Sequence, residues 1–185
     1  MTGGRVQNSS ITGVWIRLAS LNIHTWRMGG LETSLWVLHQ GNVHVGLLQE
    51  TKLTQGIHTW YCVRYTFWVT EAESCHWGGV AVVWRAATGF QVEYTARFGP
   101  NVVSFLLTPG ERKCYVVGAY VPPNVRASVH RVEQALRAAP KRLELILIGY
   151  LNAGLGDPHD NCEDMTYYFL PRRQYRGVGG WTWSM

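Results

Sequence analysis

Apolar runs separated by short polar or turn-forming segments predict a chain built mostly of strands. The runs are rich in β-branched and aromatic residues, and glycine, proline or asparagine stands between them. Two of them, VAVV and LILI, are continuously apolar, as in strands that are covered on both faces. The predicted strands are 13–23, 44–53, 60–69, 78–85, 90–98, 101–108, 113–121 and 143–152.

Two segments instead repeat apolar residues at helical spacing. The segment 31–40 places leucines three and four positions apart and stops at a Gly-Asn pair. The second helix, which Asn124 can cap and Pro140 ends, has valines and Leu136 on one face. Short turns between strands, with two helices to cover outer faces, predict an α/β (α+β) sandwich of two mainly antiparallel sheets.

The two ends of the chain lack these patterns. The polar start, MTGGRVQNSS, predicts a flexible N-terminus over residues 1–12, and the sequence from Gly154 onward is irregular. A length of 185 residues suits one domain with a substantial core, which we place at 13–185. No leading segment resembles a signal peptide, and no apolar run reaches the ~20 residues of a membrane-spanning helix. We therefore expect an intracellular protein with no membrane partner.

Charge and cysteine content narrow the function classes. Seventeen Lys and Arg against twelve Asp and Glu give a net charge of +5, which makes a polyanion such as nucleic acid a plausible partner. The four cysteines form no C-x-x-C pair and no zinc-ligand spacing. We expect them to be buried free thiols in a reducing compartment.

Polar side chains end four of the predicted strands: Asn22, Glu50, Tyr120 and the pair Tyr150 and Asn152. Each has a structural explanation when it is taken alone: a turn residue, a solvated carboxylate paired with Lys52, a rim aromatic or an Asx-turn. Four such ends on one rigid sandwich can instead hold a hard divalent cation and a phosphate together.

Five motifs in order carry a family resemblance: LNIHTW, VGLLQETKL, GGVAVVW, VVGAYVPPN and LILIGYLNAGLGDP. Together they resemble the endonuclease/exonuclease/phosphatase superfamily, and more closely the apurinic/apyrimidinic-endonuclease-like domains of non-LTR retrotransposons. The resemblance runs from about Ile16 to the C-terminus. It implies a four-layer sandwich of two mainly antiparallel β-sheets flanked by helices.

The resemblance also implies roles for four residues. Glu50 matches the glutamate that ligates Mg²⁺ (or Mn²⁺), and Asn22 matches the asparagine that assists at the metal. Tyr120 matches the tyrosine that contacts the scissile phosphate. Asn152 matches the asparagine that helps to stabilise the phosphorane-like transition state. The implied reaction is metal-dependent hydrolysis of a DNA phosphodiester, which in retrotransposons nicks the target site.

Two departures from the family pattern put catalysis in doubt. Tyr150 stands where the family has an aspartate, and a phenol with an ordinary pKa of about 10 is a poor substitute for a carboxylate of about 4. With less negative charge, we expect the metal to bind weakly. The family's later Asp-Tyr and Asp-His motifs have no match before Met185, so we expect the final strands to be missing. An uncovered sheet edge then predicts self-association or reduced stability.

Two further sets of residues have open interpretations. His24 and His159 are the histidines nearest the expected site, and we interpret both as surface or loop residues. Near the end of the chain, arginines alternate with aromatic residues: Arg172, Arg173 and Arg176 with Tyr175, Trp181 and Trp183. These arginines either bind a nucleic-acid backbone or belong to a solvated turn.

The sequence thus favours an endonuclease-like domain whose phosphodiester hydrolysis is impaired or lost. Its expected partner is DNA, its expected location is the nucleus if it functions, and no small-molecule cofactor is expected. The alternatives are a catalytically silent nucleic-acid-binding module and a non-functional retrotransposon relic.

Overall fold

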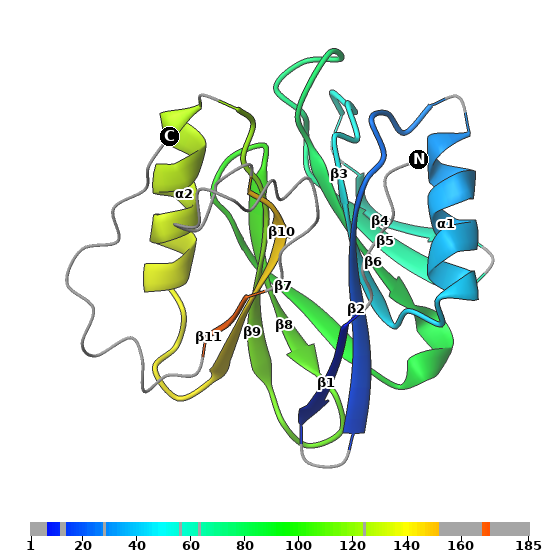
Figure 1. Cartoon of the computed structure of the whole chain (residues 1–185), viewed down its shortest axis with the longest axis vertical. Coiled ribbons are helices and arrows are strands. Elements are labelled where there is room, and N and C mark those ends of the chain that lie inside the picture. The colour runs from blue at the N-terminus through cyan, green and yellow to red at the C-terminus, as the bar shows by residue number, and fades with distance from the viewer. Residues whose placement is uncertain are drawn as a thin grey trace, which may run out of the picture.

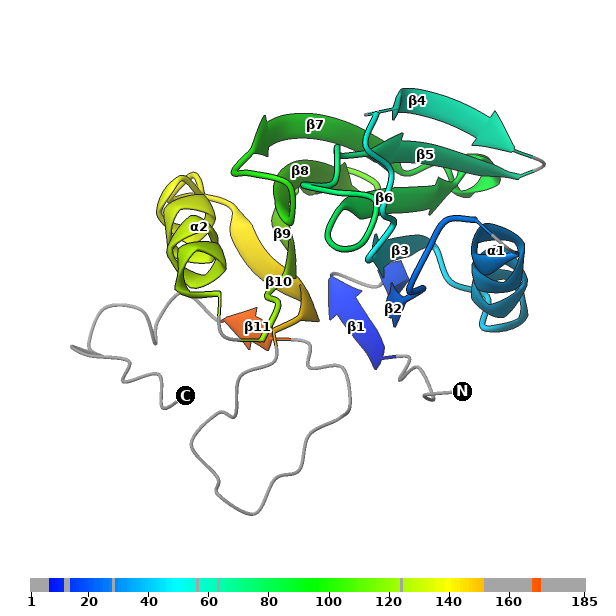
Figure 2. The same ribbon diagram turned by 90° about the horizontal axis from the view of Figure 1, so that it is seen from above.

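The computed structural model describes residues 7–11, 14–27, 29–55, 57–62, 64–123, 125–151 and 168–170. Two sheets pack face to face, and one helix covers the outer face of each (Figures 1 and 2). The predicted four-layer α+β sandwich is therefore confirmed. Within the described ranges, no helix is long and apolar enough to cross a membrane.

The six-stranded sheet has the order β1-β2-β3-β6-β5-β4. Most neighbours in it are antiparallel, but β2 and β3 are parallel because α1 connects them along the outer face. Its elements are β1 (Gln7–Ile11), β2 (Val14–Asn22), α1 (Gly30–Gln40), β3 (Val45–Gln49), β4 (Ile57–Cys62), β5 (Tyr65–Val69) and β6 (Val80–Arg85).

The five-stranded sheet has the order β11-β10-β9-β8-β7. Here β9 and β10 are the parallel pair, and α2 is their connection. Its elements are β7 (Gln91–Arg97), β8 (Val102–Thr108), β9 (Cys114–Tyr120), α2 (Arg126–Arg137), β10 (Glu144–Tyr150) and β11 (Tyr168–Leu170), and a short 3₁₀ turn, Ala86–Thr88, precedes it. Each sheet thus contains one parallel pair whose strands end side by side.

Three apolar layers hold the sandwich together. The central layer, between the sheets, is made by residues of both, including Ile16, Val82, Phe105, Val116 and Ile148. A second layer joins α1 to the six-stranded sheet, and a third joins α2 to the five-stranded sheet. Burial of this apolar surface is the main force that fixes the sheets against each other.

Three expectations about individual elements are wrong. Residues 7–11 were not predicted as a strand but form β1, which pairs antiparallel with β2. The run 60–69 is two strands, because Cys62 pairs with Tyr65 and the chain reverses between them. The region after Gly154 contains β11, which pairs with β10. The local sequence pattern does not reveal these three features, because the pairing of a strand depends on residues far away in the sequence.

Smaller expectations had mixed outcomes. Asn124 lies outside the described residues, and α2 begins after Val125 without a side-chain cap. Burial is confirmed for Cys114, whereas Cys75 is exposed. The assignment of a single domain over 13–185 remains a prediction.

Candidate active site

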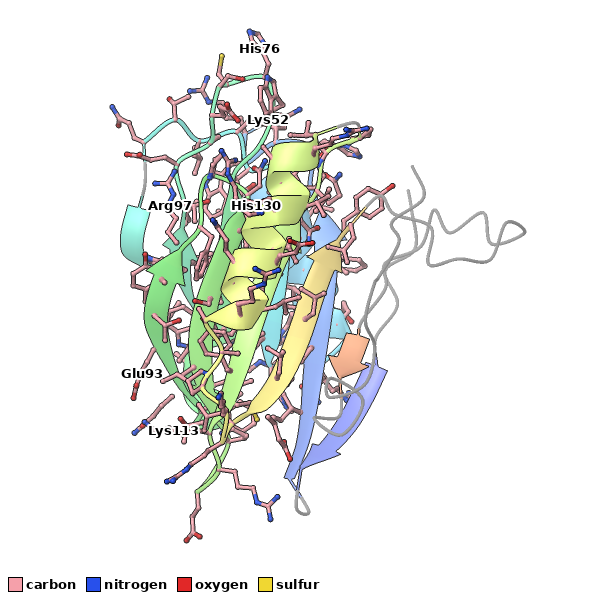
Figure 3. The ribbon with its side chains drawn as sticks, turned by 90° about the vertical axis from the view of Figure 1, so that its left-hand side faces the viewer. Lys52, His76, Glu93, Arg97, Lys113 and His130 are labelled. Carbon is pink, nitrogen blue, oxygen red and sulfur yellow. The ribbon has the colours of Figure 1, made fainter. Side chains whose placement is uncertain are left out.

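The predicted polar strand ends meet at one end of the sandwich. Asn22 ends β2 and Glu50 follows β3 directly, while Tyr120 and Tyr150 are paired at the ends of β9 and β10. We call this region the Glu50 rim and define it by six residues: Asn22, His24, Glu50, Lys52, Tyr120 and Tyr150. Figure 3 shows Lys52 at this end, opposite Glu93 and Lys113.

The Glu50 carboxylate joins the two sheets. Its Oε1 accepts a hydrogen bond from the Tyr120 hydroxyl at 2.6 Å and another from Asn22 Nδ2 at 3.0 Å. Asn22 belongs to the six-stranded sheet and Tyr120 to the five-stranded sheet. The predicted proximity of these three residues is thus present in the structure.

Two basic groups approach the other carboxylate oxygen. Lys52 Nζ lies 3.5 Å and His24 Nδ1 lies 3.9 Å from Glu50 Oε2. Burial alone would raise the pKa of Glu50, but the hydrogen bonds from Tyr120 and Asn22 and the neighbouring positive groups outweigh it and lower the pKa. Glu50 is therefore ionised and a weak proton acceptor at neutral pH.

The backbone of the rim is strained at three of these positions. His24, Glu50 and Lys52 have φ values of 58°, 57° and 56°, in the left-handed region that residues with a Cβ rarely adopt. Each such residue costs of order 1 kcal/mol or more, and it persists only where surrounding contacts enforce it. The strain turns the side chains of Glu50 and Lys52 toward each other at the strand end.

Two glycines before β6 enforce this backbone shape. The carbonyls of Gly78 and Gly79 accept hydrogen bonds from the amides of Lys52 and Thr51, at 3.0 and 3.2 Å. Both glycines have positive φ, 88° and 84°. A Cβ at Gly79 would collide with Thr51 Oγ1. Glycine is therefore required at this position by both conformation and space.

Asn101 links the same glycines to the five-stranded sheet. Its side-chain Oδ1 accepts a hydrogen bond from the Gly79 amide at 2.9 Å, and its backbone carbonyl accepts one from the Tyr120 amide at 2.8 Å. The residue is 1% exposed. Sequence reasoning missed Asn101 because an asparagine before a strand usually marks a turn.

Tyr150 lies beside Tyr120 rather than beside Glu50. The two rings stack with centroids 6.4 Å apart and planes 20° from parallel, and the Val121 amide donates to the Tyr150 carbonyl at 2.9 Å. Burial and the hydrogen bond to Glu50 raise the pKa of Tyr120 well above its ordinary value. Tyr120 is accordingly a protonated hydrogen-bond donor at neutral pH.

Several predicted site residues cannot be placed with this group. Asn152, His159, Arg172, Arg173 and Arg176 lie outside the described residues, so their roles stay predictions. His24 is a surface residue as expected, with 73% of its side chain exposed, yet its ring faces Glu50.

The described rim fits a divalent cation poorly. Within the described ranges, no three His, Cys, Asp or Glu side chains gather as metal ligands. Mg²⁺ is usually bound through one or two carboxylates together with substrate phosphates. Glu50 supplies one carboxylate, but both of its oxygens already face hydrogen-bond donors or positive groups. A Mg²⁺ or Mn²⁺ ion at Glu50 would compete with Lys52 for Oε2, and the weak binding expected from the sequence stays a prediction.

Comparison with solved structures tests the fold. The endonuclease domain of TRAS1, a telomere-specific non-LTR retrotransposon, matches with a TM-score of 0.58 and 13% identity, over 75% of this chain and 60% of that one. The AP endonuclease LMAP from Leishmania major matches with a TM-score of 0.57 and 16% identity, over 77% and 56%. The chain has the fold of these nucleases.

A third structure agrees. The 3′-5′ exonuclease NExo from Neisseria meningitidis matches with a TM-score of 0.52 and 16% identity, over 75% of this chain and 58% of that one. This chain therefore spans less than two thirds of the length of each of these nucleases. No protein-family model matches the sequence, and no curated protein does. The likeness to these three nucleases shows the fold of this chain, which is the sandwich that the five motifs predicted.

Proposed function

We propose that this chain is an endonuclease-like domain that binds the phosphodiester backbone of DNA at the Glu50 rim and hydrolyses it poorly or not at all. One observation carries the proposal. The rim holds Glu50, Asn22 and Tyr120 in contact, but the neighbouring strand end presents a phenol, Tyr150, where the family resemblance implies a carboxylate.

The described side chains suit phosphate binding. Lys52 and His24 are positive or protonatable groups at the same carboxylate that the Tyr120 hydroxyl contacts, and the three side chains carry donors of the kind that bind a phosphate oxygen. Such donors also stabilise the charge that develops when a phosphodiester is attacked. These residues therefore supply binding and electrostatic stabilisation.

What the described rim does not supply is a suitable proton acceptor. An efficient general base has a pKa near the working pH. The pKa of Glu50 is lowered, which makes it a weak base, and Tyr150 offers a phenol in place of a carboxylate. Neither group takes a proton from an attacking water efficiently at neutral pH. A metal that binds there when Lys52 moves aside would supply charge stabilisation, but not the missing carboxylate.

The structural neighbours support DNA as the partner. They are named as an endonuclease domain, an AP endonuclease and a 3′-5′ exonuclease. The retrotransposon origin of the first supports target-site nicking as the ancestral reaction of this chain. A nuclear location follows from that reaction.

The test is a nicking assay on supercoiled plasmid with Mg²⁺ or with EDTA. We expect little nicking by the natural chain and an increase of about 100-fold or more for Tyr150→Asp with Mg²⁺, because a placed general base contributes ~10²–10⁴ in rate. Tyr150→Phe is the matched control, since it changes the same ring without adding a carboxylate. Adding Glu50→Ala to Tyr150→Asp should abolish the gain.

Other outcomes select between the candidate functions. Efficient Mg²⁺-dependent nicking by the natural chain would contradict impaired catalysis. Retardation of DNA without nicking by any folded variant would favour a catalytically silent nucleic-acid-binding module, a candidate favoured by the contact between Lys52 and Glu50. Absence of both DNA binding and nicking would favour the third alternative, a non-functional retrotransposon relic. Sedimentation would test the predicted self-association through a sheet edge.

A further inference from the structure

Four basic side chains gather at the end of the six-stranded sheet opposite the Glu50 rim. We call them the α1-end cluster and define it by Arg17, His39, Arg64 and Arg85. In Figure 1 this is the end of the sheet where β2 begins. Arg17 lies in β2, Arg85 ends β6, Arg64 directly precedes β5, and His39 lies in the last turn of α1.

Backbone hydrogen bonds fix this arrangement. The His44 amide donates to the Arg17 carbonyl at 2.8 Å, and the Arg85 amide donates to the His44 carbonyl at 3.0 Å. The Ala86 amide donates to the Arg64 carbonyl, also at 3.0 Å. Arg17 and Arg85 therefore stand on strands, and Arg64 is held directly before β5 by its bond to the residue that follows β6.

The side chains converge on His39. Arg85 Nη2 lies 3.1 Å from His39 Nδ1, and Arg64 Nη1 lies 3.5 Å from His39 Nε2. A neutral imidazole has one nitrogen that accepts a hydrogen bond, and a protonated one has none. One guanidinium at least therefore meets an N–H group rather than an acceptor. Two cations thus share a partner that can satisfy only one of them.

No described carboxylate neutralises the cluster. The ion pairs within the described ranges use Glu50, Glu71, Glu93 and Glu133, and none involves a residue of the α1-end cluster. Burial and then the charges of Arg85 and Arg17 lower the pKa of nearby His44, as a positive potential requires. The cluster is an uncompensated positive site.

The C-terminal carbonyls of α1 account for only part of this arrangement. Arg17 Nη1 donates to the Gly41 carbonyl at 3.4 Å, and Arg85 Nη1 donates to Asn42 Oδ1 at 2.6 Å. A helix C-terminus does favour cations, but its effect falls off within one turn. It does not explain why Arg64 is brought to the same imidazole.

We propose that the α1-end cluster binds phosphate groups of a nucleic-acid strand, as a second contact separate from the Glu50 rim. Guanidinium groups match phosphate oxygens in charge and fork geometry. Trp36 lies one helical turn before His39 and is 63% exposed, so a base of the bound strand can stack on its ring. The inference rests on the proposed function only in requiring that the chain binds nucleic acid; it does not require cleavage.

The experiment is fluorescence anisotropy of a short single-stranded oligonucleotide in EDTA, at several salt concentrations. The test variant is Arg64→Gln with Arg85→Gln. The control is Lys113→Gln with Arg137→Gln, two exposed cations by the five-stranded sheet and α2 (Figure 3 shows Lys113). Both variants remove two positive charges from the same net charge of +5. They differ in where the charges lie and in that Lys113 and Arg137 have carboxylate partners, Glu93 and Glu133.

We expect the test variant to lose about tenfold in affinity at low salt, and its salt slope to fall by about 1.4, because each single-strand phosphate contact contributes ~0.7. The control should change little, and Arg64→Lys with Arg85→Lys should restore most of the slope. Circular dichroism checks that each variant is folded.

Three results would overturn the inference: equal losses in test and control, tighter cluster-dependent binding to phosphatidylserine vesicles than to the oligonucleotide, or full displacement by inorganic phosphate at matched phosphate concentration. Failure here together with nicking by Tyr150→Asp would remove the α1-end cluster and leave the proposed function standing. Oligonucleotide binding that depends on the α1-end cluster, in a chain that Tyr150→Asp does not activate, would support the cluster and contradict the proposed function.

Discussion

The two ends of the six-stranded sheet both gather basic side chains, but they treat charge differently. At the Glu50 rim, Lys52 and His24 face a carboxylate. At the α1-end cluster, the described residues give Arg64, Arg85 and His39 no acid. The rim is therefore close to neutral within itself, whereas the cluster depends on solvent or on an external anion. Side chains that neutralise one another are suited to holding a bound group in position, and an uncompensated positive cluster is suited to attracting an anion.

The backbone shows the same contrast. Glu50 and Lys52 lie in the left-handed region, where the Thr51 and Lys52 amides donate to the carbonyls of the chain before β6, and Asn101 ties that chain to the other sheet. At the α1-end cluster, Arg17 lies within β2 and Arg85 ends β6, whereas Arg64 directly precedes β5 and has a positive φ of 149°. Three of the six rim residues lie in the left-handed region, against one of the four cluster residues with a positive φ, so the backbone of the rim is the more constrained of the two.

Glu50→Gln should make the rim resemble the cluster. The glutamine oxygen can still accept from Tyr120 and Asn22, but Lys52 loses its counter-charge. We expect nucleic-acid affinity in EDTA to rise about fivefold at low salt, since a unit charge at ~4 Å is worth about 1 kcal/mol in water. Anisotropy measures the affinity. Unchanged or weaker binding would show that nucleic acid does not contact the rim, and Glu133→Gln on α2 controls for net charge.

Asn42→Asp should make the cluster resemble the rim. Asn42 Oδ1 already accepts from Arg85 at 2.6 Å, and its φ of 51° is one that aspartate tolerates. The new carboxylate should lower nucleic-acid affinity about threefold and raise the free energy of unfolding by about 0.5 kcal/mol, the usual size for an exposed pair. Urea unfolding and anisotropy measure the two effects, and Asn42→Ser separates charge from loss of the amide. Opposite signs for either effect would contradict an uncompensated cluster.

The smallest expected effect is a difference in acid sensitivity between the ends. The pKa of His44 is lowered from 6.5 and that of Glu50 from 4.5, so the unfolded chain binds more protons in both windows. Stability should fall as pH drops below 6.5 because of His44, and again below 4.5 because of Glu50. His44→Gln should remove the first decline and Glu50→Gln the second in urea unfolding between pH 8 and 3. If His44→Gln leaves the first decline intact, the positive potential at that end is smaller than the contacts indicate.

Much of the sandwich was predictable from sequence because its strands are long, apolar and bounded by turn residues. The segment 101–108 differs from β8 by one residue at its start, and 113–121 differs from β9 by one residue at each end. The predictions failed where a strand is polar or where one apolar run contains two paired strands. Gln7–Ile11 has little apolar content and is ordered by pairing with β2, a long-range effect that no local pattern reports.

The rim was predictable for a different reason. Asn22, Glu50 and Tyr120 each stand at the end of an apolar strand. The motifs that contain them occur in the same order as in one family, which they resemble. The residues that sequence reasoning missed act through backbone atoms or distant neighbours. Asn101 works through its backbone and side-chain carbonyl oxygens, and Arg17, Arg64 and Arg85 come together only when β2, β3, β6 and β5 are assembled in that order in the sheet. Neither arrangement leaves a motif.

The hydrogen bond from Tyr120 to Glu50 has a consequence for how this protein responds to occupancy. Because its two partners belong to different layers, the sheets cannot slide past one another without parting hydroxyl from carboxylate. A bound ligand that strengthens this hydrogen bond should also stabilise the packing of the two sheets, and a ligand that breaks it should destabilise the packing. The melting temperature should therefore report whether a ligand keeps or breaks the hydrogen bond between the Tyr120 hydroxyl and the Glu50 carboxylate.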